Sequence, residues 1–242
     1  MIRTRRSVET QSTEDSFVVC ISDLMAGLLS VFILALIFYM LNYSQVTAQL
    51  TSNNETREAI LKDIKNEMEK NKNMHGIITV DEGKEVLSLS EGVLFDSARA
   101  DLKPRGKNEI IPLLARVFET VLSKPEYEGT VETIFVEGHT DNAPIRNSRR
   151  FASNWELSTQ RAINTWTVLR TSNPKLDTLE NKNYEPLFSC SGYAETRPVT
   201  DNTTAEGRMK NRRIAFRFTM TPPTKDDAPI IKTITKELKE KR

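Results

Sequence analysis

Residues 133–142 read TIFVEGHTDN, an apolar run followed at once by a polar turn that contains glycine. The apolar part predicts a buried strand over Thr133–Glu137, because short runs of β-branched and aromatic side chains suit a sheet. Two further strands are predicted over 188–191 and, with alternating polarity, over 214–218. The stretch therefore places a short polar loop, which ends in Asp141 and Asn142, at the end of a buried strand.

A hairpin is predicted before this strand and a capped helix after it. Residues 77–80 and 86–89 are short strand signals on either side of a turn-forming stretch, Asp81–Lys84. Ser153-Asn154-Trp155-Glu156 is a capping box, which predicts a helix through about Leu169. The mixed order of elements predicts an α+β domain with its helices on one side of a small sheet.

Another helix is predicted between the hairpin and the strand. Pro104 suits a first helical position, and an apolar face follows, made by Ile110, Leu114, Val117, Phe118 and Val121. Pro112 lies inside that run, where it is expected to break or kink the early turns.

The chain also carries one membrane-length apolar segment. Residues 24–41, LMAGLLSVFILALIFYML, contain no charge, and as a helix they would span roughly 27 Å, close to the hydrocarbon thickness of a bilayer. The bulky, aromatic-rich end of the segment differs from a signal-peptide cleavage site, so we expect it to be retained as a transmembrane helix. Arg3, Arg5 and Arg6 precede it, which predicts a cytoplasmic N-terminus and a periplasmic C-terminal part.

Asp23 is the acidic residue at the cytoplasmic end of this segment. On a helix Ser22, Ala26 and Ser30 form a ridge of small residues, and Asp23 stacks on Gly27 beside it. A partner helix could approach closely there, and the partly buried carboxylate could then load and release a proton, as an ion relay requires. The alternative is a hydrated headgroup-level carboxylate favoured by the helix dipole.

Composition excludes several classes of function. There are 34 basic and 33 acidic residues, so the net charge of +1 does not indicate a nucleic-acid partner. Neither the two cysteines nor the two histidines stand at a metal-ligand spacing, and no nucleophile with a poised base or phosphate-binding loop is visible. We therefore predict a protein that is not an enzyme and needs no cofactor or metal.

The linker after the membrane segment is polar and charged, without proline or glycine. Ala59, Ile60, Ile64 and Met68 recur at helical spacing, so we expect a helical stalk that pairs with a second copy, lies against a partner or is a solvated spacer. The charged tail after Pro222 is expected to be a short docking helix or disordered. The expected regions are a cytoplasmic N-terminus (1–16), a transmembrane helix (17–43), a helical linker (44–75), the folded domain (76–220) and the tail (221–242).

Four ordered motifs carry a family resemblance. They are Glu137–Asn142 after a strand, Asn154–Ala162 on a helix, Gly192-Tyr193-Ala194, and Gly207–Arg213 before the last strand. Together they resemble the OmpA-like peptidoglycan-binding domain over roughly Gly76–Met220.

The resemblance implies a ligand and the residues that bind it. In that family the aspartate of the HTD motif and the arginine of the LSxxRA motif hold the zwitterionic end of diaminopimelate in the peptidoglycan stem peptide. They correspond here to Asp141 and Arg161, and an aspartate for the ammonium with a guanidinium for the carboxylate is sound chemistry.

Other residues are weaker candidates for the same site. Asn154 lies seven residues before Arg161 on the same predicted helix and is a plausible third contact. Either Arg212 or Arg213 could line the pocket, and Arg213 is taken as the further candidate. Asp141 could instead cap its loop, Asn154 could simply start its helix, Arg161 could form a surface ion pair, and Arg213 could only flank its strand. His139 is assigned a structural role.

The longer connection over Ala143–Ser153 and the NWELS spelling resemble the MotB branch of the family. The opening Ile21-Ser22-Asp23-Leu24-Met25 resembles the segment in which MotB-type stator subunits carry their ion-binding aspartate, and the spelling SDLMAGLL is similar to ZorB, the stator-like subunit of Zorya anti-phage systems. The resemblance implies a homodimer with a multi-pass MotA- or ZorA-like partner in the inner (cytoplasmic) membrane. Its coupling ion would be a proton, with sodium as the alternative.

The sequence thus predicts an α+β OmpA-like domain on a helical linker above one transmembrane helix, acting as a peptidoglycan-anchored stator subunit. Two alternatives remain open. A flagellar stator subunit would share every one of these residues, whereas a passive envelope tether would not need Asp23.

Overall fold

The structure is a computed structural model that describes residues 3–71, 74, 76–81, 86–145 and 150–222. The chain divides into two units, and the second, Thr51–Pro222, holds the folded domain. The described part of the first unit is the beginning of helix α1 (Arg3–Glu69), which continues into the second unit. The tail beyond Pro222, the turn over 82–85 and part of the 143–153 connection lie outside the described residues.

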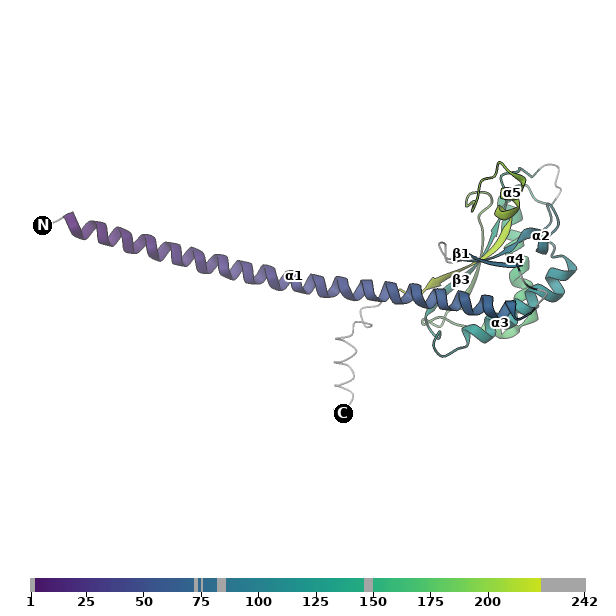
Figure 1. The fold of residues 1–242 in the computed structure, drawn as a ribbon, viewed down its shortest axis with the longest axis horizontal. Coiled ribbons are helices and arrows are strands. Elements are labelled where there is room, and N and C mark those ends of the chain that lie inside the picture. The colour runs from purple at the N-terminus through teal and green to yellow at the C-terminus, as the bar shows by residue number, and fades with distance from the viewer. Residues whose placement is uncertain (1–2, 72–73, 75, 82–85, 146–149, 223–242) are drawn as a thin grey trace, which may run out of the picture. The chain divides into compact units, whose positions relative to one another are not determined.

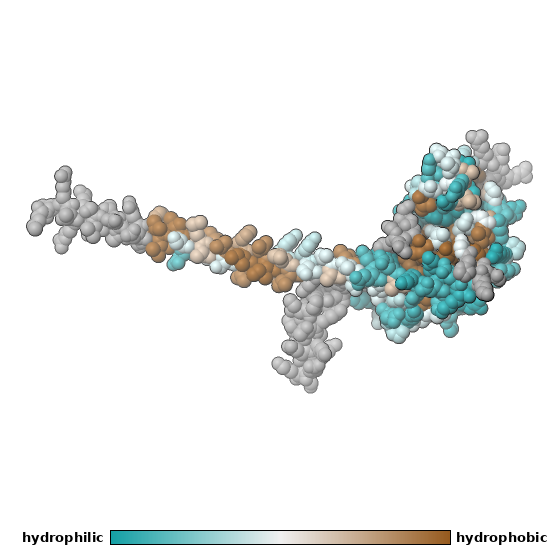
Figure 2. All heavy atoms as spheres, viewed as in Figure 1, coloured by the Kyte–Doolittle hydropathy of each residue, from teal (hydrophilic) through white to brown (hydrophobic). Residues whose placement is uncertain are grey.

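Helix α1 carries the apolar segment of the chain. Its side chains between Phe17 and Tyr43 are exposed, and Figure 2 shows them as a brown band along the helix. By length and composition this is the one helix among the described residues that could cross a membrane. The helical linker predicted after the segment is helical as far as Glu69.

The second unit is built on a five-stranded sheet with the order β1-β2-β5-β3-β4. Its strands are β1 (Ile78–Asp81), β2 (Val86–Ser90), β3 (Val131–His139), β4 (Phe188–Gly192) and β5 (Arg213–Met220). Strands β1 and β2 form the predicted antiparallel hairpin, and β5 runs antiparallel to both β2 and β3. Only β3 and β4 are parallel, with Ile134 opposite Phe188 and Gly138 opposite Gly192.

Two longer helices cover one face of this sheet (Figure 1). Helix α3 (Ile111–Leu122) and helix α4 (Asn154–Ser172) pack on each other, and α4 also packs on β3 and β4. The short elements are α2 (Glu91–Leu94), η2 (Gly106–Ile110), η3 (Pro174–Thr178) and α5 (Ala205–Asn211). The predicted α+β architecture is confirmed.

Aromatic rings fill the space between helices and sheet. Phe118 of α3 lies 5.2 Å from Phe216 and 5.9 Å from Phe188, measured between ring centroids. Trp166 of α4 stacks on Phe188 at 4.5 Å. These contacts hold α3 and α4 against β4 and β5.

The interruption expected at Pro112 is a π-helical turn. Residues Gly106–Ile110 form η2, and the regular α-helix begins only at Ile111, with the proline in its first turn. Proline lacks the N–H that the preceding turn would need, so the widened turn accommodates it.

The part of α1 from Thr51 onward belongs to the folded domain. Ile60, Ile64 and Met68 of the predicted stripe are buried in the common hydrophobic core, together with Leu61, whereas Ala59 is exposed. Asp63 forms an ion pair with Lys124 and accepts a hydrogen bond from the Tyr127 hydroxyl at 2.9 Å. The apolar stripe, for which the sequence left a second copy, a partner or solvent open, is thus buried within its own chain.

Candidate functional site

The site begins where the two parallel strands end. Strands β3 and β4 run in the same direction, so the loops that follow them leave the sheet at the same edge. The Thr140 N–H donates to the Ala194 carbonyl at 2.9 Å, and the Tyr193 N–H donates to the Gly138 carbonyl at 2.9 Å. The HTD and GYA motifs are therefore joined by backbone hydrogen bonds.

Glycine is required in both motifs because α4 passes very close beneath them. A Cβ atom on Gly138 would lie 2.0 Å from the Ser158 carbonyl oxygen, and one on Gly192 would lie 2.1 Å from the Thr159 hydroxyl. The Ser158 hydroxyl in turn accepts a hydrogen bond from the Ala194 N–H at 3.1 Å. Helix α4 thus supports both loops from below.

Helix α4 begins as the capping box predicts. The Ser153 side chain accepts a hydrogen bond from the Glu156 N–H, and the Glu156 carboxylate accepts one from the Ala152 N–H at 2.8 Å. This start places Asn154 and Arg161 on the helix that underlies the two loops.

Asp141 is nearly buried and already paired. One carboxylate oxygen accepts a hydrogen bond from the Ala143 N–H at 3.0 Å, which closes the loop. The other lies 2.6 Å from Nη1 of Arg212, whose side chain is 35% exposed. Asp141 thus caps its loop, as the sequence allowed, and pairs with a partly exposed guanidinium.

Arg161 is almost completely buried, at 2% exposure. Its Nε donates to the Arg99 carbonyl at 2.8 Å, its Nη2 to the Asp96 carbonyl at 3.3 Å, and the Phe95 ring lies 5.2 Å away. Its Nη1 meets the Glu91 carboxylate at 2.7 Å in an ion pair. A surface ion pair, the alternative considered from the sequence, is therefore excluded.

Glu91, the first residue of α2, connects these charges. Its side chain is 5% exposed, and the oxygen that meets Arg161 also lies 3.9 Å from Nε of Arg212. Burial raises the pKa of the Glu91 carboxyl above its ordinary value, and the two guanidiniums oppose that shift. Burial likewise lowers the pKa of Arg161, against the effect of Glu91. Sequence reasoning missed Glu91, because an isolated glutamate at a strand end carries no motif.

Asn154 lies beside Asp141, whereas Arg213 is held elsewhere. The Asn154 amide donates to the Ala143 carbonyl and to the Glu195 carboxylate, each at 3.1 Å. Arg213 is buried, and its guanidinium donates to the carbonyls of Asn211 and Arg197. Of the two adjacent arginines, Arg212 rather than the predicted Arg213 meets Asp141.

A known family model matches much of this domain. Residues 94–212 match the model of the OmpA family, a segment that contains three of the four linked charges. These residues form an OmpA-like domain. Glu91 lies just before the matched segment.

Relatives of the OmpA-like domain include motility proteins. The chain is 39% identical to Motility protein B of Bacillus subtilis (strain 168) over 129 residues, which are 53% of this chain and 42% of that protein. It is 30% identical to Motility protein B of Helicobacter pylori (strain J99) over 139 residues, 57% of this chain and 47% of that protein. The matched part therefore spans less than half the length of either relative.

A solved structure shares the fold. A MotB-like protein from Desulfovibrio vulgaris superposes with a TM-score of 0.53 at 22% identity, covering 73% of this chain and 98% of that one. The shared fold agrees with the α+β domain described above.

A second buried charge cluster supports the sheet of the OmpA-like domain. Glu137 on β3 accepts hydrogen bonds from Arg217 at 2.8 and 3.1 Å, and lies 3.3 Å from Nε2 of His139. Burial lowers the pKa of His139, and although burial raises that of Glu137, His139 and Arg217 lower it further. The His139 ring stacks on Tyr193. His139 thus has the structural surroundings that the sequence suggested.

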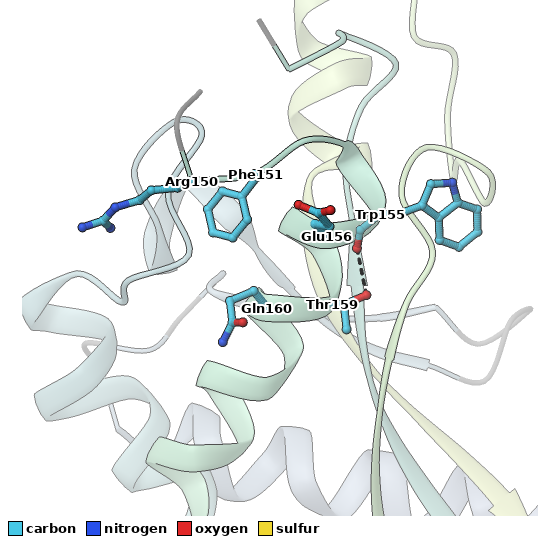
Figure 3. Close-up of a pocket in the computed structure, with 6 residues that line it drawn as sticks. All are labelled: Arg150, Phe151, Trp155, Glu156, Thr159 and Gln160. Carbon is cyan, nitrogen blue, oxygen red and sulfur yellow. Dashed lines mark hydrogen bonds between the residues drawn. The ribbon is translucent and has the colours of Figure 1, made fainter. Parts of the chain in front are cut away.

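An open hollow lies beside the start of α4 in the OmpA-like domain (Figure 3). Its volume is about 480 Å³, and its lining includes Phe151, Glu156 and Gln160, while the Trp155 ring points away from Phe151 in the figure. None of the linked charges lines this hollow. The linked charges of Glu91, Asp141, Arg161 and Arg212, rather than the hollow, are therefore the candidate site.

The remaining predicted site residue lies outside the OmpA-like domain. Asp23 is exposed on α1, in the first unit. Within the described residues, no group of three or more His, Cys, Asp or Glu side chains is placed to hold a metal ion.

Proposed function

We propose that this chain is a peptidoglycan-anchored, MotB-like subunit of an ion-driven inner-membrane motor, of the ZorB type found in Zorya anti-phage systems. In this proposal it has no enzymatic activity. Its N-terminus lies in the cytoplasm, and its OmpA-like domain binds peptidoglycan in the periplasm. The apolar segment of α1 spans the inner membrane.

The chain of charges in the OmpA-like domain carries the anchoring part of the proposal. Asp141 and the guanidiniums of Arg161 and Arg212 lie within one connected set of ion pairs, at the edge of the sheet where the motif loops meet. Diaminopimelate ends in an ammonium and a carboxylate on one carbon, and this set offers a partner for each. An incoming ammonium would share or take over the Asp141 carboxylate from Arg212, and Asn154 would add an amide beside it.

Binding to cell wall tests the anchor directly. Full-length protein in detergent is mixed with purified sacculi that contain diaminopimelate, and the bound fraction is measured after centrifugation. Asp141→Asn should weaken binding by about tenfold or more, because it removes a nearly buried charge partner. Asp101→Asn, which alters an exposed carboxylate paired with Arg150, is the matched control and should bind as the wild type does. Equal binding of Asp141→Asn and wild type would refute peptidoglycan anchoring through this site.

The membrane part of the proposal centres on Asp23. A single helix with one carboxylate cannot enclose an ion path, so Asp23 would act at the interface with a multi-pass MotA- or ZorA-like subunit, and a homodimer of this chain would supply two such helices. Asp23 would bind a proton, with sodium as the alternative, and its neutralisation would shift the packing of the partner. The apolar, exposed character of α1 around Asp23 supports this role.

Phage plating tests the motor and its biological purpose. Cells with the native gene cluster are compared when they carry wild-type chain or Asp23→Asn at equal protein level. Protection that is lost in the variant would support an ion-driven defence motor, whereas protection that survives would refute the ion-binding role. Asn at position 23 keeps the size and polarity of the side chain, so a loss reports on the ionisable group.

A flagellar stator is the second candidate, because two relatives are named Motility protein B. If neither strain is protected from phage, swimming in soft agar becomes the decisive assay. A passive tether would show neither protection nor motility that depends on Asp23.

A further inference from the structure

Glu91 has an unusual position for a carboxylate. It stands where β2 passes into α2, its side chain is 5% exposed, and its backbone N–H donates to the Arg212 carbonyl at 2.9 Å. A buried carboxylate costs several kcal/mol unless charges or hydrogen bonds compensate it. The compensation comes from two guanidiniums, those of Arg161 at 2.7 Å and Arg212 at 3.9 Å.

These contacts fix how both arginines are presented. Arg161 is held on three sides, by Glu91 and by the carbonyls of Asp96 and Arg99. Arg212 is held between two carboxylates, with Nη1 at 2.6 Å from Asp141 and Nε at 3.9 Å from Glu91. Glu91 is thus the one group of the four that touches both arginines.

The set is balanced in charge. Two carboxylates and two guanidiniums alternate in the order Arg161, Glu91, Arg212, Asp141. Without the charge of Glu91, the two guanidiniums would repel each other, and Arg161 would be left buried without a counter-ion. The partly exposed Arg212 side chain would then be held by Asp141 alone.

We propose that Glu91 is the positioning residue of this site: its buried carboxylate anchors the buried Arg161 and holds the partly exposed guanidinium of Arg212 in place to receive the carboxylate of a zwitterionic ligand. Asp141 receives the ammonium. The inference rests on the proposed function, and it adds a division of labour between the two ends of the ligand. Glu91 does not touch the ligand itself.

This division makes Glu91 responsible for selectivity. A stem peptide with lysine in place of diaminopimelate presents the same side-chain ammonium but lacks the neighbouring carboxylate. The lysine peptide can use Asp141 but has no carboxylate for Arg212. Displacing Arg212 should therefore weaken binding of the diaminopimelate peptide alone. A general loss of structure would weaken the binding of both peptides to the same extent.

The experiment compares two synthetic stem tetrapeptides that differ only in carrying meso-diaminopimelate or L-lysine at the third position. Their affinities for full-length protein in detergent are measured by calorimetry. Wild type should prefer the diaminopimelate peptide by about tenfold or more. Glu91→Gln, which keeps the shape and removes the charge, should lower that affinity by about tenfold and leave lysine-peptide affinity within about twofold. Glu109→Gln, an exposed glutamate on η2, is the matched control and should bind both peptides as the wild type does.

A second variant covers the case in which Glu91→Gln does not fold, as judged by circular dichroism. Arg212→Gln changes a partly exposed side chain and should lose the same preference, with lysine-peptide affinity unchanged or higher because Asp141 is released. If both variants fold, their combination should reduce diaminopimelate affinity by less than the product of the single effects, since Glu91 acts partly through Arg212.

If Glu91→Gln lowers the affinity for both peptides equally, or for neither, the positioning role is overturned. Where only Arg212→Gln folds, a preference retained in that variant would overturn it. Failure of the proposed function looks different, because Asp141→Asn would then bind the diaminopimelate peptide as tightly as the wild type does.

Discussion

At the scale of the residue, the close passage of α4 beneath the loops makes specific demands on side-chain size. A Cβ atom on Gly138 would overlap the Ser158 backbone, which cannot move without shifting the helix that carries Arg161. Gly138→Ala should therefore lower the free energy of unfolding by about 2–3 kcal/mol, measured by urea with tryptophan fluorescence. Gly92→Ala, where the new Cβ would lie 3.9 Å from the Ser90 hydroxyl, is the control and should change the free energy of unfolding by less than about 1 kcal/mol. Similar stabilities for the two variants would contradict the close packing of Gly138 on Ser158 of α4.

His139 should make stability depend on pH. Burial lowers its pKa from the ordinary value of 6.5, so the unfolded chain takes up a proton that the folded chain refuses. Stability should therefore fall as pH decreases from about 6.5 toward the lowered pKa. The lowered pKa of Glu137 adds a further loss only below its ordinary value of 4.5, and the guanidiniums of Arg197, Arg213 and Arg217 face the same cluster.

The variant His139→Phe keeps a ring against Tyr193 and removes the titration. Urea midpoints measured between pH 7.5 and 5 should decline less steeply in the variant than in the wild type. Parallel declines would mean that another group is responsible for the acid sensitivity.

The adjacent residues Arg212 and Arg213 show which contacts the sequence could not predict. The family resemblance implied one site for Asp141 and Arg161, and the structure brings both into one set of ion pairs. The sequence could not decide between Arg212 and Arg213, because the direction of each side chain depends on where α5 ends and β5 begins. Arg213 enters the strand opposite His139, whereas Arg212, at the end of α5, is free to turn toward Asp141. Glu91 carries no motif of its own, and its role arises only where α2 meets Arg161 of α4.

At the scale of the element, α1 joins two environments in one helix. Its later turns are amphipathic, and Ile64 is fully buried in the core of the domain. Ile64→Ala should lower the free energy of unfolding of the domain by about 3 kcal/mol, because it removes buried methyl groups and leaves a cavity. Lys62→Ala on the exposed side of the same turn is the control, expected within about 0.5 kcal/mol of wild type. A stalk that was only a solvated spacer would show no difference between them.

Periodicity predicted the elements better than their partners. The strands and α4 follow from alternation and from the capping box, which are local signals. The stripe of Ile60, Ile64 and Met68 predicted a helix correctly, yet an apolar stripe does not specify what covers it. Its partner is the distant core of the same domain, which a local pattern cannot name.

At the scale of the whole molecule, the proposed ion site and the proposed anchor lie in separate units of the chain, so their defects should separate. Asp141→Asn should lose binding to sacculi while the protein stays in the membrane fraction. Asp23→Asn should keep both membrane retention and sacculus binding but lose phage protection, since a motor needs an ion site as well as a fixed point. The double variant should protect no worse than either single variant, because both lesions stop the same machine. Partial protection in each single variant that disappears only in the double variant would mean that the two units serve independent functions, and it would count against a stator.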